Sequence, residues 1–296
     1  MTMGNWIDKI RYKKCTCYNQ EGKNFEINEN SISLYLVVTR RCNTNCRFCT
    51  FRSKDCELDV KVFKERFKEL TKVASVPTIH FTGGEPTLEL GKIKEVCEFI
   101  KEETNGLATT SVNTNGTNLQ SLAKIDALDN IALSRHHYDD AKNQSIFGST
   151  PVPTTEELLQ FEDIDKVHLS CNLIKGFIDN EKELRAFLEF SSYVKCNDVG
   201  VVSLMEVNDF CKEHFVDFQS FDLSKIENLS KVRCFFNKDE ANGETTCLCE
   251  NYLYLAKNMG LVSMYHRYAL GGSNISDYLV FEGNHIKQGF SGEILV

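Results

Sequence analysis

Apolar runs and amphipathic segments alternate along the first two thirds of the chain. Residues 33–40 (SLYLVVTR) are β-branched and apolar, as in a buried strand, whereas residues 59–75 place apolar side chains at helical spacing. Six strands separated by helices predict parallel βαβ units with right-handed crossovers. The pattern therefore indicates an α/β fold, either a partial (β/α)6 TIM-type barrel or an open doubly wound sheet. The further predicted strands are at 78–84, 108–116, 130–136, 166–175 and 198–207, and the further helices are at 91–104, 119–126, 139–147 and 179–194.

The pattern changes in the last quarter of the chain. Residues 232–255 indicate two short strands around a polar loop, and residues 277–290 indicate a hairpin that turns at the sequence EGN. We therefore expect a small β-rich C-terminal extension. The predicted parts are an N-terminal segment at 1–30, the partial barrel at 31–222 and the extension at 223–296.

Composition describes a protein of the reducing cytoplasm. Acidic residues number 42 and basic residues 34, and the net charge of −8 disfavours nucleic acid and anionic membrane surfaces as partners. The N-terminus has no signal-peptide pattern, and no apolar run reaches the roughly 18 residues of a membrane-spanning helix. Thirteen cysteines are unusual in a compartment where disulfides are rare. Metal or cluster binding is the usual reason for grouped cysteines in such a protein.

Unusual residues gather just after the predicted strands. Cys42, Cys46 and Cys49 follow the first strand, and the sequences GGEP, NTNG and SRHHY follow the next three. Ligands of both candidate folds bind at the carboxyl ends of the strands. This end of the sheet is therefore the expected functional site.

Three neighbouring cysteines suit an iron–sulfur cluster better than zinc. A structural zinc site takes four ligands, so the triplet would need another, such as Cys56. A [4Fe–4S] cluster is usually held by four thiolates. Three would leave one iron open to a ligand that carries an amine and a carboxylate, such as the methionine end of S-adenosylmethionine (SAM).

The motif pair resembles the radical SAM superfamily. The pattern Cys-x3-Cys-x2-Cys has Phe48 before its last cysteine and follows the first strand, and FTGGEP (81–86) ends the next one. By itself GGEP is also a common turn sequence. The resemblance covers about residues 33–207 and implies a partial (β/α)6 barrel, a [4Fe–4S] cluster on Cys42, Cys46 and Cys49, and reductive cleavage of SAM to a 5′-deoxyadenosyl radical. That radical would take a hydrogen atom from a substrate.

The resemblance also implies which residues hold SAM. GGEP would bind the amino group, and polar residues at later strand ends would bind the rest. Met205 matches a Leu-Met pair beside the adenine in the molybdopterin-precursor GTP cyclase branch, although it could equally be barrel core. The expected cofactor-binding residues are Phe48, Gly83, Gly84, Glu85, Pro86, Asn113, Thr114, Ser134, Asn172 and Met205.

Strand alternation selects candidate substrate-facing residues. If Ser134 points into the barrel, so does His136, while Arg135 and His137 point outward. The same argument selects His168 from Asn172. Any one of these histidines could instead be a hydrogen-bonded, half-buried side chain. The candidate catalytic residues are His136, His168 and Glu206, and His80 and Tyr138 are further candidate substrate-facing residues.

The motif pattern most resembles the molybdopterin-precursor GTP cyclase-like or SPASM-twitch branch of the superfamily. The residues expected to bind the substrate, however, differ from those of the cyclases. The cyclases carry basic residues ahead of GGEP and an arginine in the C-terminal tail. This chain has Thr78 and His80 there and ends in SGEILV. A triphosphate needs concentrated positive charge. We therefore expect a peptide or small-metabolite substrate and an electron donor such as flavodoxin or ferredoxin. An RNA-modifying radical SAM enzyme, hinted at by KIRYKK (9–14), and a non-enzymatic zinc or iron–sulfur module are the alternatives.

A second cluster is a further hypothesis. Cys234, Cys247 and Cys249 fall in the predicted extension, and alternate residues of a strand face the same side. The alternative is that they are buried and act as small hydrophobic residues. Their spacing differs from that of the GTP cyclase branch.

Overall fold

The computed structural model describes most of the chain. Within three strands, at 233–238, 245–249 and 267–268, the description covers the backbone alone. The described residues are 6–10, 31–49, 56–238, 245–268, 278–290 and 292–296.

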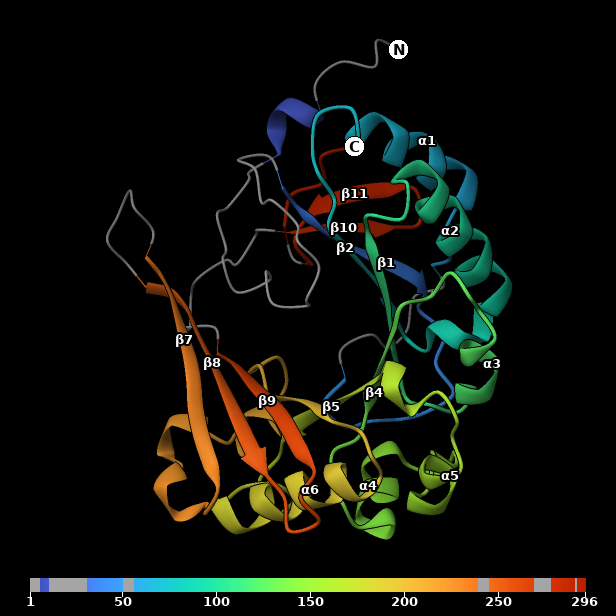
Figure 1. Ribbon diagram of the computed structural model, residues 1–296. Coiled ribbons are helices and arrows are strands. Elements are labelled where there is room, and N and C mark those ends of the chain that lie inside the picture. The colour runs from blue at the N-terminus through green and yellow to red at the C-terminus, as the bar shows by residue number, and fades with distance from the viewer. Residues whose placement is uncertain (1–5, 11–30, 50–55, 239–244, 269–277, 291) are drawn as a thin grey trace.

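The strands of the described residues form one eleven-stranded sheet. Its order is β11-β10-β1-β2-β3-β4-β5-β6-β9-β8-β7, and the eight strands from β10 to β9 run parallel. The edge pairs, β10 with β11 and β9 with β8 and β7, are antiparallel. Because β11 and β7 do not meet, the sheet is a partial barrel that is not closed (Figure 1). The strands are β1 (Ser33–Thr39), β2 (Thr78–Gly83), β3 (Thr109–Thr114), β4 (Asn130–Ser134), β5 (Val167–Leu173), β6 (Asp198–Ser203), β7 (Leu229–Lys238), β8 (Thr245–Leu255), β9 (Leu261–Tyr268), β10 (Tyr278–Glu282) and β11 (His285–Gln288).

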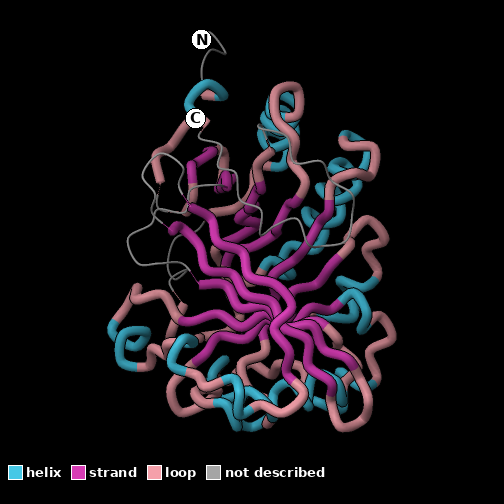
Figure 2. Tube along the Cα trace, turned by 60° about the vertical axis from the view of Figure 1, so that its left-hand side comes forward, coloured by secondary structure: helices cyan, strands magenta, loops and turns pink. Residues whose placement is uncertain are grey.

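Helices surround the outer face of the sheet, while the strands fan out through the middle of the molecule (Figures 1 and 2). Their starts are set by capping side chains: Asp59, Asp139 and Asn180 each accept a hydrogen bond from a backbone N–H of the first turn. The helices are α1 (Val60–Leu70), α2 (Leu90–Glu103), α3 (Leu119–Ala123), α4 (Asp140–Phe147), α5 (Thr155–Leu159), α6 (Glu181–Tyr193) and α7 (Asp209–Glu213), with short 3-10 turns at Ile7–Lys9, Pro86–Glu89, Ile164–Lys166, Phe218–Ser220 and Leu223–Lys225. Among the described residues, no helix is both long and apolar enough to cross a membrane.

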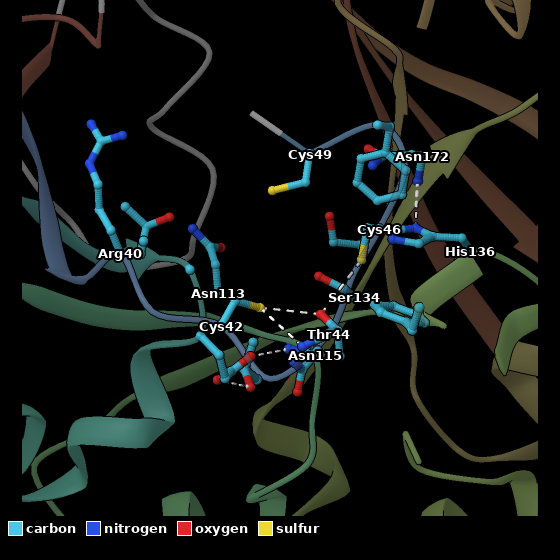
Figure 3. A pocket seen from close by; sticks show the side chains of 18 of the residues that line it. Arg40, Cys42, Thr44, Cys46, Cys49, Asn113, Asn115, Ser134, His136 and Asn172 are labelled. Atoms are coloured by element: carbon cyan, nitrogen blue, oxygen red, sulfur yellow. Dashed lines mark hydrogen bonds between the residues drawn. The ribbon is translucent and has the colours of Figure 1, made fainter. Parts of the chain in front are cut away.

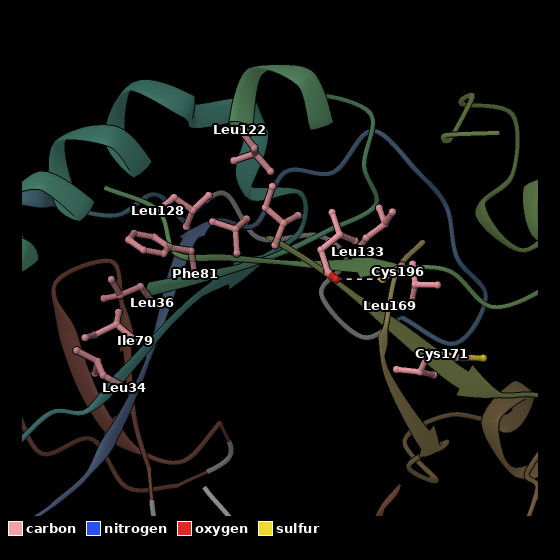
Figure 4. Close-up of a cluster of buried hydrophobic side chains, with 14 of the residues drawn as sticks. Leu34, Leu36, Ile79, Phe81, Leu122, Leu128, Leu133, Leu169, Cys171 and Cys196 are labelled. Carbon is pink, nitrogen blue, oxygen red and sulfur yellow. Dashed lines mark hydrogen bonds between the residues drawn. The ribbon is translucent and has the colours of Figure 1, made fainter. Parts of the chain in front are cut away.

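The two faces of the strands differ in chemistry. On β1 and β2, Leu36 and Phe81 lie fully buried in one hydrophobic cluster with residues of the surrounding helices (Figure 4). The alternate positions carry polar or aromatic side chains, such as Tyr35 and His80, whose rings stack at 4.8 Å. The hydrophobic core therefore lies between sheet and helices, and the inner face of the barrel is free to form a polar site.

The partial barrel is confirmed, and all six predicted strands lie close to their predicted positions. The hairpin at the C-terminus is also present as β10 and β11. The strand β9 was not predicted, because its sequence LVSMYHRY mixes apolar and polar positions. The C-terminal strands continue the barrel sheet beyond both of its edges, β9 beside β6 and β10 beside β1.

Candidate active site

A pocket of about 750 Å³ opens at the carboxyl ends of the strands (Figure 3). The loops after β1, β2 and β3 supply one wall, and β4, β5 and the segment after β6 supply another. The chain thus brings together segments that lie far apart in sequence. Of the predicted site residues, the pocket is lined by Cys42, Cys46, Cys49, Phe48, Gly83, Gly84, Glu85, Asn113, Thr114, Ser134, His136, Asn172 and Met205.

The cysteine triplet surrounds one space in this pocket. Thr44 Oγ1 lies 3.2 Å from Cys42 Sγ and 3.7 Å from Cys46 Sγ. Figure 3 shows the Cys49 sulfur facing the same space. Burial, with smaller contributions from the nearby Cys49 and Cys42 thiols, raises the pKa of Cys46 to about 11. A positively charged group beside Cys46 would favour its thiolate form.

The donor set fits an iron–sulfur cube better than a single ion. Among the residues that the structure describes, no three His, Cys, Asp or Glu side chains converge as ligands of one metal ion. Cys56, the proposed fourth zinc ligand, lies beside β10, where a Cβ at Gly283 would come within 3.1 Å of its Sγ. A cube is larger than one ion and holds its thiolates further apart, and three local cysteines match it.

Hydrogen bonds fix the triplet loop to its neighbours. The Asn115 side chain donates to Asn43 Oδ1 (2.8 Å), and Asn43 Nδ2 donates to Thr117 Oγ1 (2.9 Å). The Asn45 N–H donates to the carbonyl of Phe147 at the end of α4 (3.0 Å). These bonds pin the loop after β1 to the loop after β3 and to α4, so the thiols are positioned in advance of cofactor binding.

The two glycines of GGEP allow a close approach of backbones. Gly83 has a φ of +137°, and a Cβ there would lie 2.2 Å from the carbonyl oxygen of Thr39. A Cβ at Gly84 would lie 2.1 Å from the carbonyl oxygen of Arg41. The Gly84 N–H donates to the carbonyl of Thr39 (2.8 Å). Only glycine fits at both positions, because the end of β2 lies directly against the start of the triplet loop.

Glu85 joins two loops of the site. Its buried carboxylate accepts from Thr87 N–H (3.1 Å) and Thr87 Oγ1 (2.7 Å), and from Thr114 Oγ1 and Asn115 N–H (2.8 Å each). Pro86, also buried, begins the following 3-10 turn. The carboxylate therefore positions the loop after β3, and a direct contact of Glu85 or Pro86 with SAM stays a prediction.

His136 lies in the pocket wall as a neutral acceptor. Its Nδ1 accepts the N–H of Asn172 on β5 (3.1 Å), and its ring stacks on Phe147 at 5.2 Å, with Phe48 packed edge-on. Burial, with a smaller contribution from Arg135, lowers the pKa of His136 to about 3. Its geometry thus shows a positioning role between β4 and β5, and its catalytic role stays a prediction.

Other predicted side chains lie away from the pocket wall. His168 bonds to Tyr265 and Asp198 on neighbouring strands, and Glu206 is exposed. Arg135 points outward, as alternation predicts, but is buried: it pairs with Asp140 (2.5 Å) and donates to backbone carbonyls.

Sequence reasoning missed two aromatic side chains of the pocket. Tyr35 on β1 and Phe290 after β11 line it and pack edge-on at 5.4 Å. Alternation along β1 could have found Tyr35, because the apolar Leu34 and Leu36 on either side of it face the core. Phe290 reaches the site only through the pairing of β10 with β1, which the sequence pattern does not contain.

The hypothesis of a second cluster is not decided by the structure. Cys234 lies in β7 and Cys247 and Cys249 lie in β8, whose strands pair antiparallel. Their side chains lie outside the described part of the chain, as do Cys15 and Cys17. The second cluster stays a prediction.

The open barrel and the three-cysteine site define a class of enzymes that cleave SAM at an iron–sulfur cluster. The family model of the radical SAM superfamily matches residues 36–190, and the chain belongs to this superfamily. Members use a [4Fe–4S] cluster together with SAM. The residues of this pocket fit both groups, since it offers three thiols together with amide and hydroxyl groups. The assignment of the cluster to Cys42, Cys46 and Cys49 stays a prediction.

Related proteins carry GTP cyclase names. The chain is 27% identical to a probable GTP 3′,8-cyclase of Methanocaldococcus jannaschii over 223 residues, which cover 68% of this chain and 66% of that protein. It is 27% identical to the GTP 3′,8-cyclase of Aquifex aeolicus, over 62% of this chain and 64% of that protein. The matches thus span a little under two thirds of these relatives. Among solved structures, SuiB of Streptococcus suis bound to SAM has a TM-score of 0.52 at 18% identity, over 64% of this chain and 44% of that one, and supports the fold.

Proposed function

We propose that this radical SAM enzyme abstracts a hydrogen atom from a peptide or small-metabolite substrate held in the barrel. When bound, the cluster and SAM supply a 5′-deoxyadenosyl radical. The protein's own part is to hold the cluster by Cys42, Cys46 and Cys49 and to orient SAM beside it. An electron donor such as flavodoxin or ferredoxin would deliver the reducing electron.

The neutral polar wall suits the cofactor. Asn113, Ser134 and Asn172 present amide and hydroxyl groups, which can donate to a carboxylate and accept from an amine or a ribose hydroxyl. Met205 is 72% exposed at the pocket and offers apolar surface for a flat ring. These groups can bind the amine, the carboxylate and the ribose hydroxyls of SAM without adding net charge to the pocket.

One observation carries the choice of substrate: the arginines of the pocket are already paired. Arg40 bonds to Glu282, which also binds Lys287 at 2.5 Å. Arg41 bonds to Glu89 and lies 3.0 Å from Glu57. A triphosphate binds where positive charge is concentrated and uncompensated. The paired arginines therefore favour a substrate without a triphosphate.

A second candidate substrate is a purine nucleoside triphosphate, favoured by the names of the GTP 3′,8-cyclases above. Calorimetry with GTP separates the two. We expect no binding at micromolar GTP and no acceleration of 5′-deoxyadenosine formation, because neither arginine is available without breaking an ion pair. The control titration is SAM into the same reconstituted protein. Tight GTP binding would return the chain to cyclase chemistry.

The substrate class can be tested with fractions of a cell extract. Anaerobically reconstituted protein with SAM and reductant is mixed with a small-metabolite, a peptide or an RNA fraction, and 5′-deoxyadenosine is measured. We expect acceleration by a metabolite or peptide fraction, with the Cys46→Ala variant as the inactive control. Acceleration by the RNA fraction alone would contradict the proposal and support an RNA-modifying enzyme.

A further inference from the structure

Three side chains on neighbouring strands form a hydrogen-bonded series outside the pocket lining. Asp198 Oδ2 on β6 lies 2.9 Å from His168 Nδ1 on β5, and His168 Nε2 lies 2.9 Å from the hydroxyl of Tyr265 on β9. The rings of His168 and Tyr265 are nearly parallel, at 6° and 5.1 Å. A carboxylate oxygen accepts, so His168 Nδ1 donates to Asp198, and in this tautomer Nε2 accepts from the Tyr265 hydroxyl. The order Asp, His, hydroxyl is that of an activated hydroxyl group.

A glycine makes room for this arrangement. A Cβ at Gly200 would lie 2.6 Å from Cζ and the hydroxyl oxygen of Tyr265 and 2.8 Å from His168 Nε2. The backbone φ of Gly200 is one that any residue can adopt. Glycine is needed here because any larger side chain would overlap Tyr265 and His168. Tyr265 thus folds back across β6, and its hydroxyl lies over Gly200 rather than at the outer edge of the sheet.

The hydrogen-bonded series Tyr265, His168 and Asp198 runs from the barrel interior to solvent. Gly200 is the register partner of both Tyr265 and Ser170, and Ser170 lines the pocket. The Tyr265 hydroxyl therefore lies about one strand spacing, roughly 5 Å, from the pocket wall. At the other end, the first residue of β6, Asp198, has a side chain that is 55% exposed. His168 between them is only 15% exposed.

We propose that Tyr265, His168 and Asp198 form an acid–base site that exchanges a proton between a group bound in the barrel and solvent. Tyr265 Oη takes a proton from a weakly acidic group of the bound molecule while its own proton passes to His168 Nε2. The Nδ1 proton of His168 passes to Asp198, which releases it to water. No electron is transferred in these steps, and reversing them delivers a proton. The inference rests on the proposed function only in placing a substrate inside the barrel.

The test is the reactivity of Tyr265 toward an aryl sulfonyl fluoride, which needs neither SAM nor substrate. Attack by Oη forms the sulfonate ester and expels fluoride, and the phenol proton goes to His168. Reconstituted protein is labelled and each tyrosine is quantified by peptide mass spectrometry. We expect Tyr265 to react faster than the exposed Tyr193, and His168→Gln or Asp198→Asn to slow it on the order of tenfold, because the base or its anchor is lost.

Controls separate chemistry from folding. Asp165→Asn removes an exposed carboxylate before β5 and should leave Tyr265 labelling unchanged. Gly200→Ala should slow labelling by displacing the hydroxyl from His168, while Tyr193 keeps its rate. If His168→Gln fails to fold, the exposed position of Asp198 makes Asp198→Asn decisive. Labelling of Tyr265 no faster than Tyr193, or unchanged in Asp198→Asn, would overturn the proposal. A failure of SAM cleavage would instead contradict the proposed function and leave this result standing.

Discussion

At the residue scale, Glu85 shows how one side chain of a motif can hold the loops of a site together. Four protein donors converge on its carboxylate, from the turn after β2 and from the end of β3. All lie in a buried environment, where an unpaired donor costs more than a lost surface bond. The loops of β2 and β3 therefore depend on this one group for their relative position.

Removing the Glu85 carboxylate should destabilise the fold. Glu85→Ala leaves the Thr114 hydroxyl and the Asn115 N–H without their acceptor, so we expect a loss of about 1 to 3 kcal/mol in urea unfolding. Glu95→Ala is the matched control, because Glu95 pairs with Lys64 at the surface and its loss should cost less than about 1 kcal/mol. Equal losses in the two variants would contradict this account of Glu85.

The glycines of GGEP give a second residue-scale prediction. Gly84→Ala should weaken SAM binding by shifting the loop, because the added Cβ would overlap the carbonyl oxygens of Arg40 and Arg41. Gly91→Ala is the matched control, since a Cβ there meets nothing within 4 Å and Gly91 lies in α2. That control should keep SAM affinity and gain up to about 1 kcal/mol of stability. SAM calorimetry checks both, and unchanged affinity in Gly84→Ala would argue against the close approach.

At the element scale, β9 is held by a buried histidine. His266 stacks on Phe218 at 3.8 Å, and burial lowers its pKa to about 4. The unfolded chain binds a proton near pH 6.5, whereas the folded chain does so only near pH 4. The contribution of His266 to the free energy of unfolding is therefore fully present above pH 6.5 and falls as the pH drops toward 4.

The slope of this loss is measurable. Each pH unit below 6.5 should cost up to about 1.4 kcal/mol through His266. In His266→Phe, which keeps a ring on Phe218, the slope between pH 6.5 and pH 5 should be smaller. Urea unfolding at several pH values tests this, with His285→Phe on the exposed side of β11 as control. An unchanged slope in His266→Phe would contradict the account.

The sequence predicts where the strands lie along the chain better than it predicts which strands pair with one another. Strands β1 to β6 could be recognised because their outward positions are apolar and their carboxyl ends carry the motifs. The strand β9 has a buried face and a polar inner face, so its sequence lacks a continuous apolar run. The pairing of β10 with β1 joins residues more than 240 positions apart, and no local signal encodes it. Tyr265 and Asp198 were missed for the same reason, whereas the triplet and GGEP carry their chemistry in local spacing.

At the scale of the whole molecule, the sheet extends beyond both edges of the six-stranded unit. Beside β1, the Arg40, Glu282 and Lys287 side chains tie the triplet loop to β10 and β11. Beside β6, β9 supplies Tyr265 to the inner face. The C-terminal strands thus extend the inner face beside the site and pair one of its arginines with a carboxylate. This pairing of a pocket arginine supports the proposal of a substrate without a triphosphate.

The central claim is that the cysteine triplet holds the cluster at which SAM is cleaved. The most direct measurement is 5′-deoxyadenosine formation, with iron content, by anaerobically reconstituted protein given SAM and reductant. The wild type should form 5′-deoxyadenosine, and Cys42→Ala, Cys46→Ala and Cys49→Ala should each fall to background, since each removes one of three protein ligands. Cys56→Ala, a half-buried cysteine outside the triplet, should retain activity. Normal 5′-deoxyadenosine formation in any triplet variant, or a wild type that binds one zinc and cleaves no SAM, would contradict the account.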